Sequence, residues 1–261
     1  MPIDMPIVSV LSLKGGVGKT SVVLGLAGAA TVRGLATLVI DLDPQGNATS
    51  ILASDKPTAT AADLFTHPTL ETLHKALTPC AWEVAPGEVD VVPSSPALIS
   101  HDAFRSDATF RPRLARALSK LEGYDLVLID CPPSLGSLTR DALAASDLAL
   151  VVSTPSYFGL QGAERAANEI EEIRKHHNPK LKLVGVLPNR VRTIADEHDF
   201  RINELGELFG RKVMRPSIPE RIAFQQAEGF GKPVQTLHTT GAREVSAIFD
   251  KHLDHILRAV R

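Results

Sequence analysis

The sequence is poor in the residues that crosslink a chain or gather metals. It holds two cysteines, Cys80 and Cys131, among 261 residues. Two are too few for a disulfide framework, and they have no metal-ligand spacing. Lysine and arginine number 28 against 30 aspartate and glutamate residues, so no overall positive field attracts nucleic acid. Any such binding would need a local basic patch.

Long apolar runs are missing as well. No run approaches the roughly 18 residues that span a bilayer, and no basic-then-apolar leader precedes residue 7. We therefore expect a cytoplasmic protein. A chain of 261 residues can bury a substantial core, and we expect one domain over residues 1–261.

Short apolar runs are present, and they alternate with helical patterns. Continuous Val, Ile and Leu runs are typical of strands covered on both faces. Their alternation with helices predicts an α/β fold, a doubly wound, mainly parallel sheet flanked by helices. Between two of these runs, residues 54–86 indicate short helices and loops inserted within the domain. The expected strands are residues 7–11, 36–41, 89–93, 124–130, 148–152 and 181–187.

A glycine-rich loop follows the first apolar run. Residues 14–20 read Lys-Gly-Gly-Val-Gly-Lys-Thr. Such a loop between a strand and a helix turns its backbone N–H groups toward a β-phosphate, and the helix expected over residues 19–32 adds its positive end. We expect the nucleotide to be held by Gly15, Gly16, Val17, Gly18, Lys19, Thr20 and Ser21.

Two residues of this loop have specific expected roles, and two depart from the consensus. Lys19 should neutralise the β- and γ-phosphates, and the Thr20 hydroxyl should ligate Mg²⁺. The consensus loop has glycine at position 13, where this chain has Leu13, and Lys14 is an additional lysine. By itself Lys14 is either a solvated loop lysine or a functional cation.

Acidic residues end two of the expected strands. Asp130 precedes Cys131 and two prolines, and it matches a Walker B acid that binds Mg²⁺ directly or through water; the alternative is a helix N-cap. Asp41 ends the other strand and is a second expected metal-site carboxylate. Asp43 lies just beyond the strand, better placed to polarise a water in line with the γ-phosphate, although its segment also contains ordinary turn formers.

Together these segments resemble the ParA/MinD family of deviant Walker A P-loop ATPases, in its ParA (Soj-like) branch. The resemblance rests on residues 14–20, 41–49, 130–133, 155–162, 218–219 and 231–234. It implies ATP and Mg²⁺ as cofactors and a face-to-face homodimer closed by ATP. Lys14 would reach the partner's nucleotide as an arginine finger does, Asp43 would orient the attacking water, and Asn189 and Pro219 would lie around the adenine.

The resemblance also implies a positioning or partitioning ATPase, nucleoid-associated and released from non-specific duplex DNA by a ParB-like or other cargo-adaptor protein. The cargo would be a plasmid, a chromosome region or a protein. DNA-partitioning relatives typically place an arginine where this chain has Ala223, so Arg215 and Arg221 are the candidate DNA contacts. Residues 190–221 hold seven basic and six acidic residues, which is a mixed surface.

Three other classes stay open on the sequence. A MinD-like membrane switch would end in a basic amphipathic helix, whereas the C-terminal stripe has a mixed opposite face; we expect the stripe to pack on the core without a membrane partner. A nitrogenase-iron-protein-like reductase would need paired cysteines, and both cysteines are expected to be small buried residues. A small-molecule P-loop kinase or ligase is the third class. The stripe comprises Ile248, Phe249, Leu253, Ile256, Leu257 and Val260.

Overall fold

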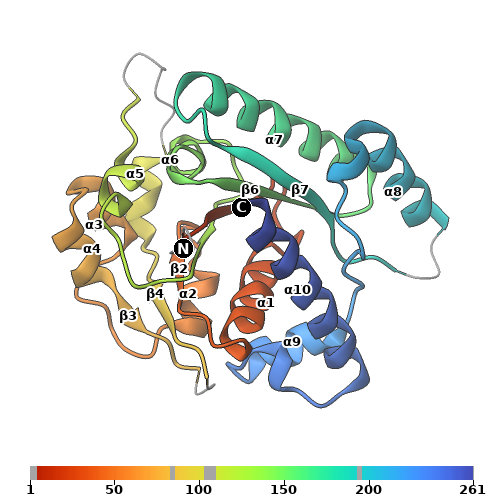
Figure 1. Cartoon of the computed structure of the whole chain (residues 1–261), viewed down its shortest axis with the longest axis horizontal. Coiled ribbons are helices and arrows are strands. Elements are labelled where there is room, and N and C mark those ends of the chain that lie inside the picture. Colours follow the sequence, from red (N-terminus) through yellow and green to blue (C-terminus); the bar gives the residue numbers. More distant parts are fainter. Residues whose placement is uncertain (1–4, 83–85, 103–109, 193–195, 261) are drawn as a thin grey trace.

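The computed structural model describes residues 5–82, 86–102, 110–192 and 196–260. Its centre is a seven-stranded sheet with the order β3-β4-β2-β5-β1-β6-β7 (Figure 1). The pairs are parallel except for β3 with β4, which is antiparallel. The strands are β1 (Ile7–Leu11), β2 (Thr37–Asp41), β3 (Thr78–Pro79), β4 (Val89–Val92), β5 (Leu126–Asp130), β6 (Leu148–Ser153) and β7 (Lys182–Pro188).

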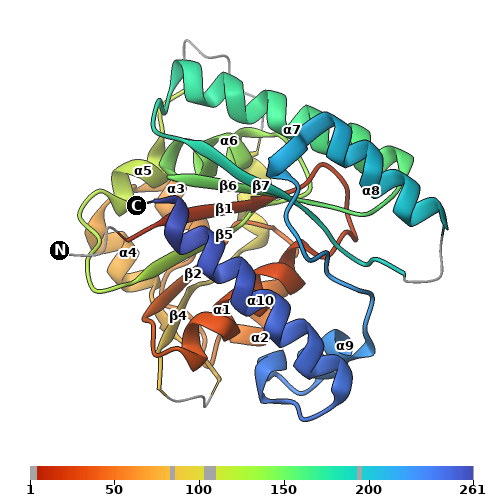
Figure 2. The same ribbon diagram turned by 45° about the vertical axis from the view of Figure 1, so that its right-hand side comes forward.

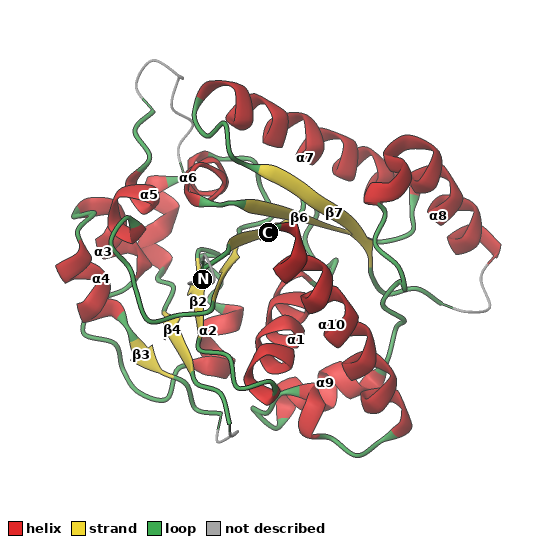
Figure 3. Ribbon diagram, viewed as in Figure 1, coloured by secondary structure: helices red, strands yellow, loops and turns green. Residues whose placement is uncertain are grey.

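Helices cover both faces of the sheet (Figures 2 and 3). One face carries α1 (Lys19–Val32), α2 (Asn47–Leu52), α9 (Ile222–Gly229) and α10 (Thr240–Ala259). The other carries α3 (Ala61–Thr66), α4 (Leu70–Ala76), α5 (Arg113–Leu118), α6 (Ser137–Ala145), α7 (Tyr157–His176) and α8 (Asp196–Phe209). Short 3-10 helices span Pro96–His101 (η1), Gly210–Lys212 (η2) and Val234–Thr236 (η3).

The apolar runs form strands because each strand feeds both hydrophobic layers. In β5, Leu126 and Leu128 face the cluster around α1 and α10, while Val127 and Ile129 face the cluster on the other side. Side chains alternate across a strand, so a continuous apolar run is what two covered faces require. The α/β prediction with a mainly parallel sheet is confirmed.

The expected strands all exist, with small shifts at their ends. The runs at residues 36–41 and 124–130 form strands that begin later, at Thr37 and Leu126. The helix expected over residues 19–32 matches α1. Residues 54–86 contain α3 and α4 as expected, with residues 83–85 outside the described part. They also contain β3, which the sequence did not indicate because it has two residues and one is Pro79.

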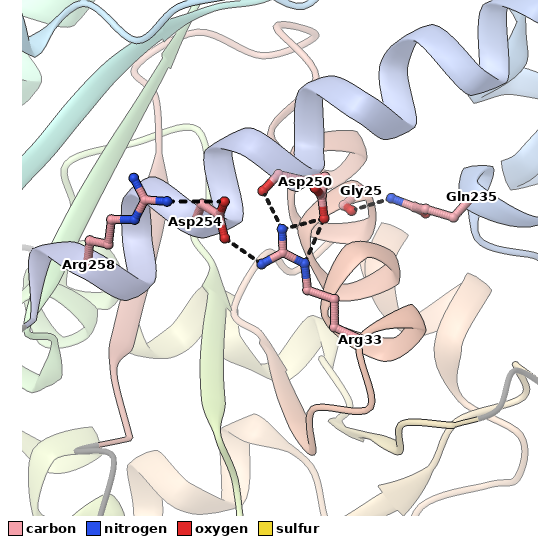
Figure 4. Close-up of polar contacts among 6 residues, drawn as sticks. All are labelled: Gly25, Arg33, Gln235, Asp250, Asp254 and Arg258. Atoms are coloured by element: carbon pink, nitrogen blue, oxygen red, sulfur yellow. Dashed lines mark hydrogen bonds and ion pairs between the residues drawn. The ribbon is translucent and has the colours of Figure 1, made fainter.

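The last helix, α10, packs against the first helix, α1. The two helices lie side by side below the sheet in Figure 2. A Cβ on Gly25 would lie 2.1 Å from the Phe249 ring, so only glycine admits that ring. Arg33, just after α1, donates to Asp250 at 2.6 Å and to Asp254 at 2.7 Å (Figure 4). These contacts hold α10 along α1.

The C-terminal stripe is therefore an internal surface, as expected. Phe249, Leu253 and Ile256 are completely buried, and Ile248 is 8% exposed. In the part of the chain that the structure describes, no helix has the length and apolar character to cross a bilayer.

Candidate nucleotide-binding site

The glycine-rich loop connects β1 to α1 at the carboxyl edge of the sheet, where ligands bind in such folds. Gly16 and Gly18 have φ of 75° and 88°, a region that suits glycine. Gly18 is also the N-cap of α1, so the first amides of that helix open toward the loop. A Cβ on Gly18 would meet the Asn189 amide nitrogen at 2.4 Å, which adds a packing reason for glycine there.

A cavity of about 430 Å³ lies against this loop, and we call it the loop cavity. Six of the expected nucleotide residues line it, together with Asp43 from the segment after β2. Val17 does not line it, because its side chain is 2% exposed and packs in the core. The six lining residues are Gly15, Gly16, Gly18, Lys19, Thr20 and Ser21.

Thr20 and Asp130, both expected to hold Mg²⁺, are in contact in the structure. The Thr20 hydroxyl donates to Asp130 Oδ2 at 2.7 Å. Asp130 is 1% exposed, and its other carboxylate oxygen, Oδ1, is buried with no hydrogen-bond partner. An unpartnered buried carboxylate oxygen beside a hydroxyl is costly unless a cation satisfies it.

The carboxylates of Asp41 and Asp130 lie on neighbouring strands in register. Burial raises the pKa of Asp130 to about 8, and the Asp41 carboxylate adds to the rise while Thr20 and Lys19 oppose it. Burial also raises the pKa of Asp41 to about 6, against hydrogen bonds from Thr49. Two buried like charges of this kind favour a cation between or beside them.

The two acids differ in how far their oxygens are already engaged. Asp41 accepts from the Thr49 amide at 2.8 Å and hydroxyl at 2.7 Å, and its other oxygen accepts from the Asp43 amide at 3.1 Å. Neither carboxylate lines the loop cavity itself, whereas Thr20, which donates to Asp130, does. Asp130 Oδ1, by contrast, has no partner. Of the two expected metal-site carboxylates, Asp130 is therefore the one with an oxygen available.

These residues fit a magnesium ion. The described part of the chain contains no group of three His, Cys, Asp or Glu residues that could hold a metal by itself. Mg²⁺ is usually bound through one or two protein oxygens together with substrate phosphates and water. Thr20, which lines the loop cavity, and Asp130, to which its hydroxyl donates, supply that kind of partial site.

Asp43 is positioned by the turn between β2 and α2. Its Oδ1 accepts from the Gln45 amide at 3.0 Å, and its carbonyl oxygen accepts from the Gly46 amide at 2.8 Å. Gly46, with φ of 65°, permits this tight turn before α2. Asp43 is 7% exposed and lines the loop cavity, which places this residue beside the space where the phosphates would lie.

Lys14 lies outside the loop cavity that its neighbours line. Its side chain is exposed, and its Nζ lies 5.6 Å from the centre of the Phe158 ring. Phe158 belongs to the first turn of α7 and is 64% exposed. The ammonium group therefore rests on an exposed aromatic face.

A second hollow of about 100 Å³, which we call the side hollow, adjoins the loop cavity. Asn189 and Pro219, both expected near the adenine, line it. Asn189 also donates to the Val17 carbonyl at 2.7 Å, which ties the end of β7 to the glycine-rich loop. The structure thus places these two residues, which are far apart in the sequence, in one hollow beside the loop.

Two residues of this region were missed by the sequence reasoning. Arg190, whose φ is 58°, and Glu228 both line the loop cavity and the side hollow. Glu228 Oε1 accepts from the Ser21 hydroxyl at 2.6 Å. No local motif marks Glu228, because it lies in α9, far along the chain from the loop. In the sequence, Arg190 is one basic residue of the mixed surface at residues 190–221.

The two candidate DNA contacts have different surroundings. The Arg221 guanidinium is held by Glu244, with nitrogen–oxygen distances of 2.7 and 3.1 Å. Arg215 lines a separate cavity of about 460 Å³ with Arg211, Lys251 and Arg258, which we call the basic hollow. Among the described residues that line it, Asp254 is the one carboxylate, and it already pairs with Arg33 and Arg258 (Figure 4). The positive charge of the basic hollow is therefore largely uncompensated.

The cysteines do not form the exposed pair that a cluster-bridging reductase needs. Cys131 is completely buried, and Cys80 is half-buried. Burial raises the pKa of the Cys80 thiol to about 11 and that of Cys131 to about 12. The thiolate is the form that ligates metals, so neither thiol is poised for that role. Cys131 fits the expectation of a small buried side chain, whereas Cys80 is only half-buried.

Comparisons with known proteins agree with this geometry. A family model described as an AAA domain matches residues 5–183. Soj, the sporulation initiation inhibitor protein of Bacillus subtilis (strain 168), is 32% identical over 241 residues, 87% of this chain and 89% of that protein. The chromosome partitioning protein ParA of Myxococcus xanthus is 33% identical over 235 residues, 87% of this chain and 80% of that protein.

Among solved structures, a cobyrinic acid a,c-diamide synthase of Mycobacterium smegmatis with bound ADP and magnesium is similar. It superposes with a TM-score of 0.77 at 27% identity, covering 98% of this chain and 97% of that chain. The similarity therefore extends well beyond the glycine-rich loop, over almost the whole sheet and its helices.

Proposed function

We propose that this protein works as a nucleotide-timed switch between monomer and homodimer. The chain belongs to the ParA (Soj-like) family of deviant Walker A ATPases, and it is an ATP-hydrolysing positioning enzyme. ATP closes the dimer, and hydrolysis opens it. The observation that carries this proposal is the placement of Lys14, an exposed cation outside its own loop cavity.

The proposed nucleotide site follows from the lining of the two hollows. The phosphates lie in the loop cavity against the amides of residues 15–20, with Lys19 as the neutralising cation. Thr20 and Asp130 hold Mg²⁺, which supplies positive charge at the phosphates, and Asp41 supports them from the neighbouring strand. The adenine lies in the side hollow near Asn189 and Pro219.

Two side chains act on the bond that breaks. Asp43 accepts a hydrogen bond from the attacking water and orients it toward the γ-phosphorus. Lys14 of one protomer approaches the nucleotide of the other, where it stabilises the charge that develops on the transferred phosphoryl group. Neither protomer has a complete site by itself, so hydrolysis depends on dimer formation.

A dimerisation measurement tests this switch. The Asp43→Ala variant should bind ATP and hydrolyse it slowly, because only the orientation of water is lost. With ATP and Mg²⁺ this variant should elute as a dimer in size-exclusion chromatography with light scattering, and with ADP as a monomer. A monomer under both conditions would contradict the proposed switch and assign Asp43 a structural role.

We further propose that the ATP dimer binds duplex DNA through the basic hollow without sequence preference. The protein would then alternate between the nucleoid, in its ATP-bound form, and the cytoplasm. A ParB-like or other cargo-adaptor protein would stimulate hydrolysis and release the dimer. Lysine and arginine groups that contact DNA phosphates give binding that weakens steeply with salt. Pairing two protomers doubles the number of such contacts, which explains why ADP would abolish the binding.

Arg215 and Arg221 form a matched pair for the DNA test. Each change to glutamine removes one positive charge. Arg221 pairs with Glu244, whereas Arg215 has no carboxylate partner among the residues that the structure describes. In the ATP-locked Asp43→Ala protein, Arg215→Gln should weaken DNA binding and reduce the salt slope by about one to two units per dimer. Arg221→Gln should change both much less.

Two outcomes would contradict the DNA proposal. Absence of DNA binding at low salt would leave a MinD-like switch that works on a membrane or protein scaffold. Equal weakening by Arg215→Gln and Arg221→Gln would move the DNA surface away from the basic hollow.

A further inference from the structure

Glu228 occupies the boundary between the two hollows of the proposed nucleotide site. It lines the loop cavity and the side hollow, and Ser21 and Arg190 are the other residues common to both. Glu228 lies in the last turn of α9, a helix that otherwise belongs to the side-hollow wall through Phe224 and Gln225. Glu228 thus lies where the loop cavity meets the side hollow, which we call the junction, and it comes from α9 and not from the glycine-rich loop.

The ribose is the part of a nucleotide that lies between its phosphates and its base. If the phosphates lie in the loop cavity and the base in the side hollow, the sugar hydroxyls face the junction residues. A carboxylate accepts hydrogen bonds from ribose hydroxyls in other nucleotide-binding folds. We propose that Glu228 accepts a hydrogen bond from the 2′-hydroxyl and makes the site selective for ribonucleotides over 2′-deoxyribonucleotides, an inference that rests on the proposed nucleotide site.

The hydrogen bond from Ser21 supports this role. Ser21 belongs to the first turn of α1, and its hydroxyl holds Glu228 Oε1 at 2.6 Å. This bond fixes one carboxylate oxygen and leaves the other to accept from the sugar, since an ionised carboxylate has about four acceptor positions. Ser21 is therefore a positioning residue for Glu228 in this proposal.

Charge considerations set the limits of the proposal. A carboxylate that faced the phosphates directly would repel them and weaken nucleotide binding. Arg190 lines the same two hollows and offsets that repulsion. The loop amides and Lys19 also line the loop cavity and supply positive charge to the phosphates. Removal of the Glu228 carboxylate distinguishes these two roles. If Glu228 binds the ribose, its removal weakens nucleotide binding, whereas if it repels the phosphates, its removal strengthens nucleotide binding.

The test compares ADP with 2′-deoxyADP on the full chain. These ligands avoid hydrolysis and ATP-driven dimerisation, so the dissociation constants report the monomer site. Binding can be followed by titration calorimetry or by the fluorescence of Trp82, the only tryptophan of the sequence, which lines a narrow gap together with Ser21 and Glu228.

The wild-type chain should bind ADP about tenfold more tightly than 2′-deoxyADP, as expected for a hydrogen bond to a charged acceptor. Glu228→Ala should weaken ADP binding and bring the ratio of the two constants to about one, within twofold. Glu228→Gln, which keeps an acceptor but loses the charge, should give an intermediate ratio. Gln226→Ala is the matched control, because Gln226 is an exposed residue of α9 that lines neither hollow.

Each outcome separates this inference from the proposed nucleotide site. If Glu228→Ala leaves the ADP to 2′-deoxyADP ratio at its wild-type value, or tightens ADP binding, Glu228 is not a ribose acceptor although the nucleotide site stands. A wild-type chain that binds neither nucleotide would overturn the nucleotide site itself.

Discussion

Lys14 and Lys19 are five residues apart in one loop, yet their surroundings differ. Lys19 is 7% exposed and lines the loop cavity, whereas Lys14 is exposed and lies against Phe158. The loss of Lys19 removes the cation that faces the phosphates. The loss of Lys14 leaves the protomer's own nucleotide contacts unchanged.

We therefore predict that Lys19→Ala weakens ATP binding by about 100-fold or more, while Lys14→Ala binds ATP with nearly the wild-type affinity. Equilibrium binding of a fluorescent ATP analogue to both monomers measures this difference. Nearly wild-type affinity in Lys19→Ala would rule out the phosphate assignment of the loop.

Site residues could be predicted from the sequence where the signal is local. The spacing of Lys19 and Thr20 in the loop, and Asp130 at the end of an apolar run, indicated where these side chains meet. Glu228 could not be predicted, because its contact with Ser21 depends on how α9 folds back onto α1. The pairing of Arg221 with Glu244 was equally invisible, since only tertiary structure brings those two helices together.

At the scale of elements, the close packing of α1 against α10 depends on a glycine, which has no side chain. Gly25 leaves the space that the Phe249 ring fills. Gly206 in α8 is the counterexample, because a Cβ there would meet nothing within 4 Å. The same substitution should therefore have opposite effects in the two helices.

Gly25→Ala gains helix propensity of about 1 kcal/mol but overpacks the Phe249 contact at a cost of about 1–3 kcal/mol, so we expect net destabilisation. Gly206→Ala gains the propensity alone and should stabilise by about 0.5–1 kcal/mol. Urea unfolding of both variants measures the difference. Stabilisation by Gly25→Ala would mean that the Phe249 ring moves aside without cost.

His252 makes α10 sensitive to acid. It is 1% exposed, and its ring contacts the Pro216 carbonyl at 2.9 Å. Burial, with smaller contributions from His255 and Lys251, lowers the pKa of His252 to about 4. The unfolded chain binds this proton near pH 6.5 and the folded chain only near pH 4, so stability falls as the pH decreases from 6.5 toward 4.

This single group should remove about 2 kcal/mol of the unfolding free energy between pH 7 and pH 5. His252→Gln should show a smaller loss over that range, because it cannot gain a charge. His255→Gln, at an exposed position of the same helix, is the control. It should stay close to the wild type, because His255 makes only a small contribution to the pKa of His252. Parallel pH profiles for wild type and His252→Gln would contradict the prediction.

Elements were predicted well where their pattern is continuous. The strands at residues 7–11 and 148–152 could be predicted because short apolar runs that alternate with helical patterns are typical of strands covered on both faces. The short β3 was missed because two residues carry no periodicity. The first residues of β2 and β5 were predicted too early in the chain, because Ala36 and Tyr124 extend the apolar pattern but lie outside the strands.

At the scale of the whole molecule, the proposed sites are shared between protomers. A site is then complete only when it has its own Asp43 and the partner's Lys14. This arrangement can be tested by mixing two inactive variants, Lys14→Gln and Asp43→Ala. In a mixed dimer, the nucleotide of the Lys14→Gln protomer has an intact Asp43 and receives an intact Lys14 from its partner.

Each variant alone should hydrolyse ATP very slowly, and an equimolar mixture should recover about a quarter of the wild-type rate. Half of the randomly paired dimers are mixed, and each mixed dimer has one complete site of two. If Lys14 acted on its own protomer's nucleotide, the mixture would stay inactive. A coupled phosphate-release assay at high protein concentration distinguishes these results.

The burial of α1 has a consequence for exchange with solvent. Residues 22–31 of this helix are all buried, enclosed by the sheet and by α10. Amide hydrogens in such a segment exchange mainly when the whole molecule opens, whereas peripheral helices exchange through local fluctuations. Deuterium uptake should therefore be slow in α1 and much faster in α8. The glycine-rich loop is thus anchored to a strongly protected helix, and nucleotide release should proceed without any local unfolding of that helix.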